Sequence, residues 1–332
     1  MLTIIRVKKR ENRKSTIVEG KETMKTQRRK SKLKIQLKRD WRLYAMLAIP
    51  FIWYILFCYK PMGGVIIAFQ KYSIFKGIAG SKFVGWDNFK FVFGMRDFGI
   101  ALGNTLLLNF LDLVFGFPMP IILAIMLNEM RAKRLKKFSQ TMLYLPHFLS
   151  WVIIGGMVLK IFAPTTGVIN ALLLKSGLVD KNVPFLTQGN WWQFTYVLVG
   201  VWQNMGWGTI LYLAAITGLD MNLFEAAQID GANKLQQIWH VTLPGIRSTI
   251  IILLILNIGR MMSIGFDRPY IIGNTIVKDY CDVISTFVYR IGIVNAKFDR
   301  ATAVGLFQSV IGMILVTVAN TISRVFDEQG IW

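Results

Sequence analysis

Six stretches of mostly apolar residues, each long enough to cross a lipid bilayer, constrain this 332-residue chain more than any other feature. An α-helix needs about 20 such residues to cross about 30 Å of hydrocarbon. Polar loops punctuated by Gly and Pro separate the stretches, which disfavours buried helices of a soluble protein. The sequence therefore predicts an all-α membrane protein with six transmembrane helices. The six windows are 42–59, 104–127, 140–163, 196–219, 246–266 and 302–322.

The net charge of +21 is concentrated at the N-terminus. Residues 1–40 hold 15 Lys and Arg against 4 Asp and Glu, and no aromatic residue lies among them. We interpret 1–40 as a basic cytoplasmic tail near anionic lipid, and 41–332 as the six-helix membrane domain. The tail is too basic and too long before the first window to be a cleavable signal peptide. Without interleaved aromatic residues, it is not expected to bind nucleic acid.

The loop after the second window fixes the expected orientation. It reads NEMRAKRLKKF (128–138), and Lys and Arg are enriched in cytoplasmic loops. This loop and the basic tail should therefore lie inside. Alternation then places residues 60–103, 164–195 and 267–301 outside the cell, and residues 220–245 together with both termini in the cytoplasm.

A compact polar insert, residues 220–245, separates the fourth and fifth windows. Asn222 is in position to cap a first short helix, with Glu225 three residues on as in a capping box. Gly231 suits the turn after that helix. A second helix is expected over about 232–241, with Pro244 ending it before the fifth window. Local chemistry alone leaves open whether the insert is a well-capped connection or a docking element.

The insert also resembles a family motif. Glu225-Ala226-Ala227, three residues, Gly231, nine residues and Val241-Thr242-Leu243-Pro244 resemble the EAA loop of binding-protein-dependent ABC importer permeases. That family usually has Ile where Val241 stands. Four further stretches resemble its carbohydrate branch, in particular permeases for oligosaccharides derived from polysaccharides such as alginate and pectin: GNTLLLN (103–109), GVINALL (167–173), RATAVGLFQSVIGMILV (300–316) and FDEQGIW (326–332).

The resemblance implies a type I ABC importer permease fold in a bacterial plasma membrane. It implies that 220–245, between helices 4 and 5, is the coupling loop that docks on an ATPase, with Glu225 as its ionic anchor. The implied partners are a second permease subunit that is homologous but not identical, two ATPase subunits, an extracellular solute-binding protein and membrane lipid. ATP and Mg would bind to the partner ATPase, since this chain has no GxxxxGK[ST] pattern and is expected to bind no cofactor and to be no enzyme. The predicted coupling residues are Glu225, Ala226, Ala227, Gly231, Val241, Leu243 and Pro244.

Two of the charged residues within the windows, Asp112 and Arg260, need separate consideration, because a charge inside the membrane marks a functional site by default. Asp112 lies in the second window and Arg260 in the fifth. In a structural interpretation, the two residues pair with each other or with polar neighbours, or Arg260 extends outward to the interface. In a functional interpretation, Arg260 faces the substrate path. The path candidates are Arg260, Asn257, Asp267, Asn204 and Trp202.

Basic residues at the outer ends of the windows favour an acidic oligosaccharide over a cation as the cargo. Neutral sugars remain an alternative, because Trp202, Asn204 and Trp207 supply polar and aromatic contacts. The basic residues in question are Lys160, Arg268, Arg290, Lys297 and Arg300.

A secondary transporter or channel is the alternative function, and it would require paired intramembrane carboxylates or inverted repeats. A membrane enzyme would require a cluster of polar residues within the windows. The sequence shows no paired intramembrane carboxylates, no inverted repeats and no such polar cluster. His147, His240 and the two cysteines, Cys58 and Cys281, fit no metal-binding spacing, so we expect no metal site. The GFPMP segment (116–120) should kink or break the second helix, for packing or as a hinge.

Overall fold

The computed structural model describes residues 39–325. The predicted basic tail, apart from Arg39 and Asp40, and the FDEQGIW ending lie outside these residues. The chain divides into two compact units, Met1–Gly64 and Val65–Trp332.

The described part of the first unit is a single helical run. It consists of α2 (Trp41–Tyr54), a π-helical turn (Ile55–Tyr59) and α3 (Lys60–Met62). With the 3-10 turn Gly63–Phe69 that follows, it forms a stretch of 29 residues that is apolar enough to cross a membrane. The first predicted window, 42–59, falls within this stretch.

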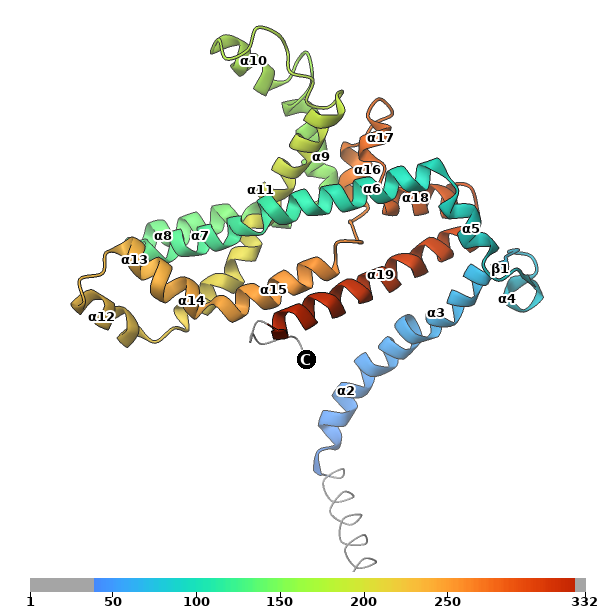
Figure 1. Cartoon of the computed structure of the whole chain (residues 1–332), viewed down its shortest axis with the longest axis horizontal. Coiled ribbons are helices and arrows are strands. Elements are labelled where there is room, and N and C mark those ends of the chain that lie inside the picture. Colours follow the sequence, from blue (N-terminus) through green and yellow to red (C-terminus); the bar gives the residue numbers. More distant parts are fainter. Residues whose placement is uncertain (1–38, 326–332) are drawn as a thin grey trace, which may run out of the picture. The chain divides into compact units, whose positions relative to one another are not determined.

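The second unit is helical apart from a short antiparallel ribbon, in which β1 (Gln70–Lys71) pairs with β2 (Lys82–Phe83). The long helices α15 and α19 pack side by side, and α12 lies at the opposite end of the unit from α16–α18 (Figure 1). The helices are α4 (Gly77–Gly80), α5 (Asp87–Phe93), α6 (Arg96–Leu111), α7 (Pro118–Glu129), α8 (Lys133–Tyr144), α9 (Trp151–Ile161), α10 (Val168–Lys175), α11 (Gly189–Thr217), α12 (Met221–Ile229), α13 (Lys234–Gln237), α14 (Leu243–Gly245), α15 (Arg247–Gly259), α16 (Asp267–Ile272), α17 (Lys278–Cys281), α18 (Ile284–Tyr289) and α19 (Phe298–Val325).

Three helices in residues 39–325 are long and apolar enough to cross a membrane: Trp41–Phe69, Arg96–Glu129 and Phe298–Arg324. Three further pairs of helices qualify when each bent pair is taken as one span. The predicted number of six is reached on that basis. The windows 104–127, 196–219 and 302–322 fall within the Arg96–Glu129 run, α11 and α19, apart from Gly218 and Leu219 at the end of the fourth window.

The third window, 140–163, is not one straight helix as predicted. It spans two helical segments, Lys133–Phe148 and Trp151–Ile161, which are bent by 98° at residues 149–150. The break has a local cause, because Leu149 and Ser150 adopt extended backbone and Ser150 starts a new helix by accepting the Ile153 N–H.

The fifth window, 246–266, ends earlier as a helix than predicted. Helix α15 stops at Gly259, and residues 260–266 are mostly irregular. Backbone without helical hydrogen bonds is tolerated at membrane depth only where protein or water satisfies it. Here Asn109 donates to the Met261 carbonyl at 2.7 Å and Gln308 donates to the Met262 carbonyl. Side chains from the second and sixth spans therefore stabilise the irregular segment.

The prolines of GFPMP do not break the second span. The helical run is continuous from Arg96 to Glu129, and a π-helical turn, Asp112–Gly116, precedes Pro118. A widened turn of this kind accommodates residues that lack an N–H, and π-turns often lie at functional sites. The predicted irregularity is therefore present, but as a wide turn beside Asp112.

Candidate functional site

The insert between the fourth and fifth spans forms two helical segments joined by a tight turn. Helix α12 is capped by Asp220, whose carboxylate accepts the Asn222 N–H at 3.0 Å. The predicted cap, Asn222, is therefore wrong by two residues, because Asp220 already holds the extended backbone that a cap requires. Glu225 accordingly makes no capping box and lies exposed on α12.

Gly231 ends α12 as the sequence predicts. Its φ is +79°, its N–H bonds the Gln228 carbonyl, and the Ala232 N–H bonds the Ala227 carbonyl. This double hydrogen bond is the Schellman arrangement, which requires a left-handed residue. Glycine is therefore needed here for its backbone conformation.

The second segment runs from Lys234 to Gly245, further than the predicted 232–241. Asn233 and Gln236 form a capping box at its start. The segment ends at Gly245, one residue after Pro244, so the expected end before the fifth window is confirmed. Pro244 itself lies inside the segment, directly after the π-helical turn Ile238–Thr242, a widened turn that accommodates a residue without an N–H. The axis then bends by 61° into α15.

The insert presents an exposed surface. Glu225 forms no ion pair with any residue of 39–325, whereas Lys234 pairs with Glu129 at 3.0 Å and ties the insert to the end of α7. A hollow of about 270 Å³ brings together Ala227, Gly231 and Val241. Glu225, Ala226, Leu243 and Pro244 lie outside the hollow. The large exposed apolar side chains of the insert are Met221, Leu223, Ile229, Leu235 and Trp239.

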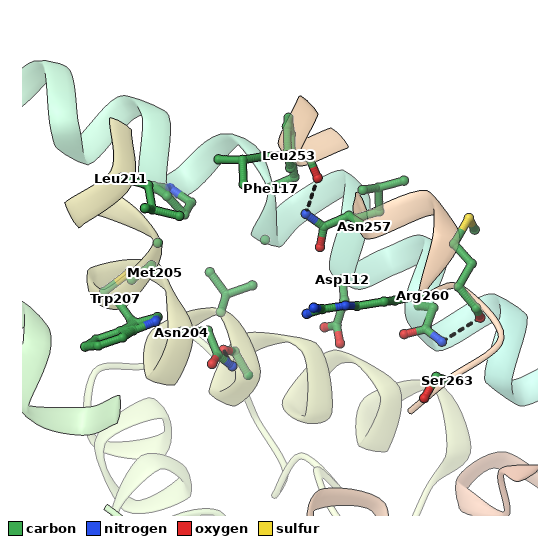
Figure 2. Close-up of a pocket in the computed structure, with 18 of the residues that line it drawn as sticks. Asp112, Phe117, Asn204, Met205, Trp207, Leu211, Leu253, Asn257, Arg260 and Ser263 are labelled. Atoms are coloured by element: carbon green, nitrogen blue, oxygen red, sulfur yellow. Dashed lines mark hydrogen bonds between the residues drawn. The ribbon is translucent and has the colours of Figure 1, made fainter. Parts of the chain in front are cut away.

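A cavity of about 480 Å³ lies between the second span, α11, α15 and the irregular segment after α15 (Figure 2). Polar side chains line it beside the aromatic rings of Phe117, Trp207 and Tyr212. Figure 2 shows Arg260 extending into this space from the end of α15. The polar lining residues are Asn109, Asp112, Asn204, Asn257, Arg260, Ser263 and Arg268.

Asp112 pairs with Arg268, a partner 156 residues away in sequence. Two guanidinium N–H groups reach the two carboxylate oxygens at 2.7 and 3.1 Å, a bidentate geometry. No ion pair joins Asp112 to Arg260 within residues 39–325. Of the open alternatives, pairing with another residue holds for Asp112, whereas no side-chain hydrogen bond or ion pair of Arg260 is found among residues 39–325.

Arg268 is held by Tyr196 and Trp151 as well as by Asp112. It donates to the Tyr196 carbonyl, its Cζ lies 3.5 Å from the centroid of the Tyr196 ring, and Trp151 lies beyond at 5.6 Å. A Cβ atom on Gly200 would overlap the guanidinium, so the absence of a side chain there makes room for it. The side chain is only 10% exposed, whereas that of Asp112 is 30% exposed.

Three of the five predicted path residues line the cavity: Arg260, Asn257 and Asn204. Asn257 donates to the Leu253 carbonyl at 2.7 Å, and Asn204 donates to the Gly200 carbonyl at 3.0 Å. Asp267 and Trp202 are exposed and do not line it. Sequence reasoning missed the roles of Arg268 and Asn109, because each contacts an element far away in the chain.

A second charge network holds the hairpin of residues 273–297 to the first turn of α6. Arg290 bonds both oxygens of Asp282, at 3.0 and 2.6 Å, and lies 3.2 Å from Asp97. Its hydrogen bonds to Asp282 raise the pKa of the Arg290 guanidinium above its ordinary value. Arg290 and Arg268 are thus both neutralised by carboxylates, and neither adds a free positive charge to the outer side as the sequence had suggested.

Each histidine has a close neighbour among the described residues. His147 stacks on Trp207 with ring centroids 4.7 Å apart, and a ring nitrogen of His240 lies 3.0 Å from the Gln236 carbonyl. Neither histidine belongs to a group of residues that could hold a metal ion within the described chain.

Bent apolar spans around a cavity with a polar lining are the architecture of a multi-pass membrane protein. Residues 99–329 match the family described as "Binding-protein-dependent transport system inner membrane component". The chain belongs to this family.

Relatives extend the match over nearly the whole length. Protein LplB of Bacillus subtilis is 44% identical over 296 residues, covering 89% of this chain and 92% of that protein. The polygalacturonan/rhamnogalacturonan transport system permease protein YteP of the same organism is 42% identical over 304 residues, covering 92% of this chain and 94% of that protein. The chain also superposes on a chain in the crystal structure of a bacterial ABC transporter involved in the import of the acidic polysaccharide alginate. The TM-score is 0.80 at 42% identity, and the match covers 88% of this chain and 98% of the other.

These matches confirm the predicted class, the all-α importer permease fold and the role as a transport subunit that is not an enzyme. They place the chain in an inner membrane as part of a system that depends on a binding protein. The alternative of a secondary transporter or channel finds no support.

Proposed function

We propose that this chain is the membrane-spanning subunit of an ATP-driven importer for an oligosaccharide, and that an acidic, polysaccharide-derived oligosaccharide is its cargo. The cavity carries this proposal. It is lined by aromatic rings and amide side chains suited to sugar hydroxyl groups, and Arg260 is its one charged lining residue without a charged partner in residues 39–325. The proposal is also supported by the relatives named for polygalacturonan/rhamnogalacturonan and alginate transport.

The proposed assembly contains a second, homologous permease subunit, two ATPase subunits that bind ATP and Mg, and an extracellular solute-binding protein. A relative of this chain has been crystallised with an alginate pentasaccharide-bound periplasmic protein, which supports the last of these partners. This subunit itself is proposed to bind no cofactor.

The insert of residues 220–245 is proposed to dock on the ATPase. Its exposed apolar side chains and the Glu225 carboxylate, which has no ion-pair partner in residues 39–325, supply the two contacts that such a surface needs, apolar area and an ionic anchor. Gly231 fixes the angle between the two helical segments. The proposed contact residues are Glu225, Ala226, Ala227, Gly231, Val241, Leu243 and Pro244.

Orientation is proposed from the basic residues of the loop after the second span. Arg131, Lys133 and Lys137 are exposed there, as cytoplasmic loop residues are expected to be. Both termini and the insert would then face the cytoplasm, where the ATPase is.

Uptake of two matched cargoes tests the proposed function. The assembled importer in proteoliposomes is given a uronic-acid trisaccharide, or the same trisaccharide with its carboxylates reduced to alcohols. Wild type should prefer the charged cargo, and Arg260→Gln should lower that preference about tenfold, as expected for loss of one unit charge in a partly aqueous cavity.

Lys175→Gln is the matched control, since Lys175 is an exposed cation outside the cavity. Equal uptake of both cargoes by wild type, together with no effect of Arg260→Gln, would mean that Arg260 is structural and the cargo is not selected by charge.

A further inference from the structure

The cavity wall has three charged residues: Asp112, Arg260 and Arg268. Two of them cancel, because Arg268 binds Asp112 through both oxygens. The third, Arg260, has no charged partner within residues 39–325 and is exposed. The cavity therefore carries one net positive charge, although it holds two arginines.

Arg268 cannot reach a cargo without leaving its site. The Tyr196 carbonyl and ring, the Gly200 backbone and Asp112 surround it, and only 10% of its side chain is exposed. The Asp112 carboxylate is more open, at 30% exposure, so a solute in the cavity meets this carboxylate before it meets the arginine behind it. Removing the carboxylate would leave the fixed guanidinium charge uncompensated at the wall.

We propose that Asp112 is a specificity-determining residue, which with Arg268 forms a fixed neutral pair and thereby holds the cavity at one positive charge. Limiting the positive charge of the cavity has a function in transport, because a cargo must be bound weakly enough to leave as well as tightly enough to enter. Two uncompensated arginines would retain a polyanionic oligosaccharide. This inference rests on the proposed passage of cargo through this cavity.

The charge of the cavity wall can be measured without any cargo. Ser263 is exposed and lines the cavity. Ser263→Cys is introduced into the assembled importer after Cys58→Ala and Cys281→Ala. The modification rate of this cysteine is measured with two methanethiosulfonate reagents of similar size, one carrying a sulfonate and one a trimethylammonium group. The ratio of the two rates reports the local electrostatic potential.

The ratio should follow the net charge of the wall. Asp112→Asn, which keeps the shape of the side chain, should raise the anion-to-cation ratio about tenfold, and Arg268→Gln should lower it about tenfold. The double variant Asp112→Asn/Arg268→Gln restores one net positive charge and should return the ratio to that of wild type. Lys175→Gln, an exposed cation outside the cavity, should leave the ratio unchanged.

An unchanged ratio in Asp112→Asn overturns the proposal, and this variant alone decides the matter if Arg268→Gln fails to assemble. A double variant that keeps the ratio of one single variant overturns it as well, since the effect would then belong to one side chain and not to the net charge. Uptake of the two trisaccharides separates the claim about the charge of the cavity wall from the claim about the cargo. If the reagent ratios follow the charge but neither trisaccharide is carried, the proposed cargo is wrong and the charge assignment stands.

Discussion

Gly200 is the position at which a single methyl group should disturb the cavity most. The guanidinium of Arg268 lies against its backbone, and a Cβ atom there would come closer than 3.0 Å to Cζ and both terminal nitrogens. Gly200→Ala must therefore displace Arg268 from Asp112 and Tyr196, or shift α11. Either response should destabilise the protein.

The size of the effect follows from two costs and one gain. Overpacking costs about 1–3 kcal/mol, and separating a buried ion pair costs about 3–5 kcal/mol. Replacing a helical Gly by Ala returns about 1 kcal/mol. Because Asp112 is partly exposed and can be rehydrated, the lower end applies, and we expect a net loss of about 3 kcal/mol.

The assay is thermal unfolding of the purified chain in one detergent, followed by tryptophan fluorescence. Gly103→Ala is the matched control, since it also lies in a membrane-spanning helix and its Cβ would have no neighbouring atom within 4 Å. Gly200→Ala should melt at least about 5 °C below this control. If the two variants melt together, Arg268 is not clamped against α11 as described.

Three further outcomes are expected. In intact cells, an impermeant maleimide should label a cysteine placed at Lys82 and not one placed at Lys133; labelling at Lys133 from outside would reverse the proposed orientation. Asn170→Ala should destabilise the protein by about 2–3 kcal/mol, because the buried amide donates to the Ala163, Pro164 and Val183 carbonyls and accepts the Val183 N–H. Asn190→Ala, at an exposed position, is the control, and equal melting temperatures of the two variants would contradict the burial of Asn170. Burial raises the pKa of the Cys281 thiol. In Cys58→Ala, the rate of Cys281 alkylation should therefore be slow at neutral pH, and should still increase with pH where an exposed thiol has already reached its full rate. Fast labelling at neutral pH would mean that the 273–297 hairpin opens.

Local chemistry predicted the features that depend on neighbouring residues. The positive φ of Gly231 follows from the residue type and its place after a short helix. The apolar windows located the spans, because their lengths are set by the bilayer and not by the fold. The cap of α12 was misplaced by two residues, since Asp220 and Asn222 are both good caps and only the backbone decides between them.

Features that depend on distant contacts could not be predicted. The sequence places Arg268 among the basic residues of the outer loops and outer span ends, and gives no sign of its partner Asp112, which lies 156 residues earlier. The end of α15 at Gly259 was missed because the irregular segment is stabilised by Asn109 and Gln308, on two other spans. The bend at residues 149–150 was missed because hydropathy is insensitive to the direction of a helix.

The central claim is that the 220–245 insert of this chain couples ATP hydrolysis on a partner to passage of the cargo. Removing the Glu225 carboxylate should weaken docking by about 1–3 kcal/mol, and Gly231→Pro replaces a φ of +79° with one locked near −65°. Gln228→Ala, an exposed change on the same helix, is the control.

The most direct measurement is the number of oligosaccharides taken up per ATP hydrolysed, determined in one proteoliposome preparation for wild type, Glu225→Ala, Gly231→Pro and Gln228→Ala. The account predicts that this ratio falls several-fold in the first two variants while the subunit remains in the membrane, and that Gln228→Ala keeps the wild-type ratio. Wild-type ratios in both Glu225→Ala and Gly231→Pro would contradict it.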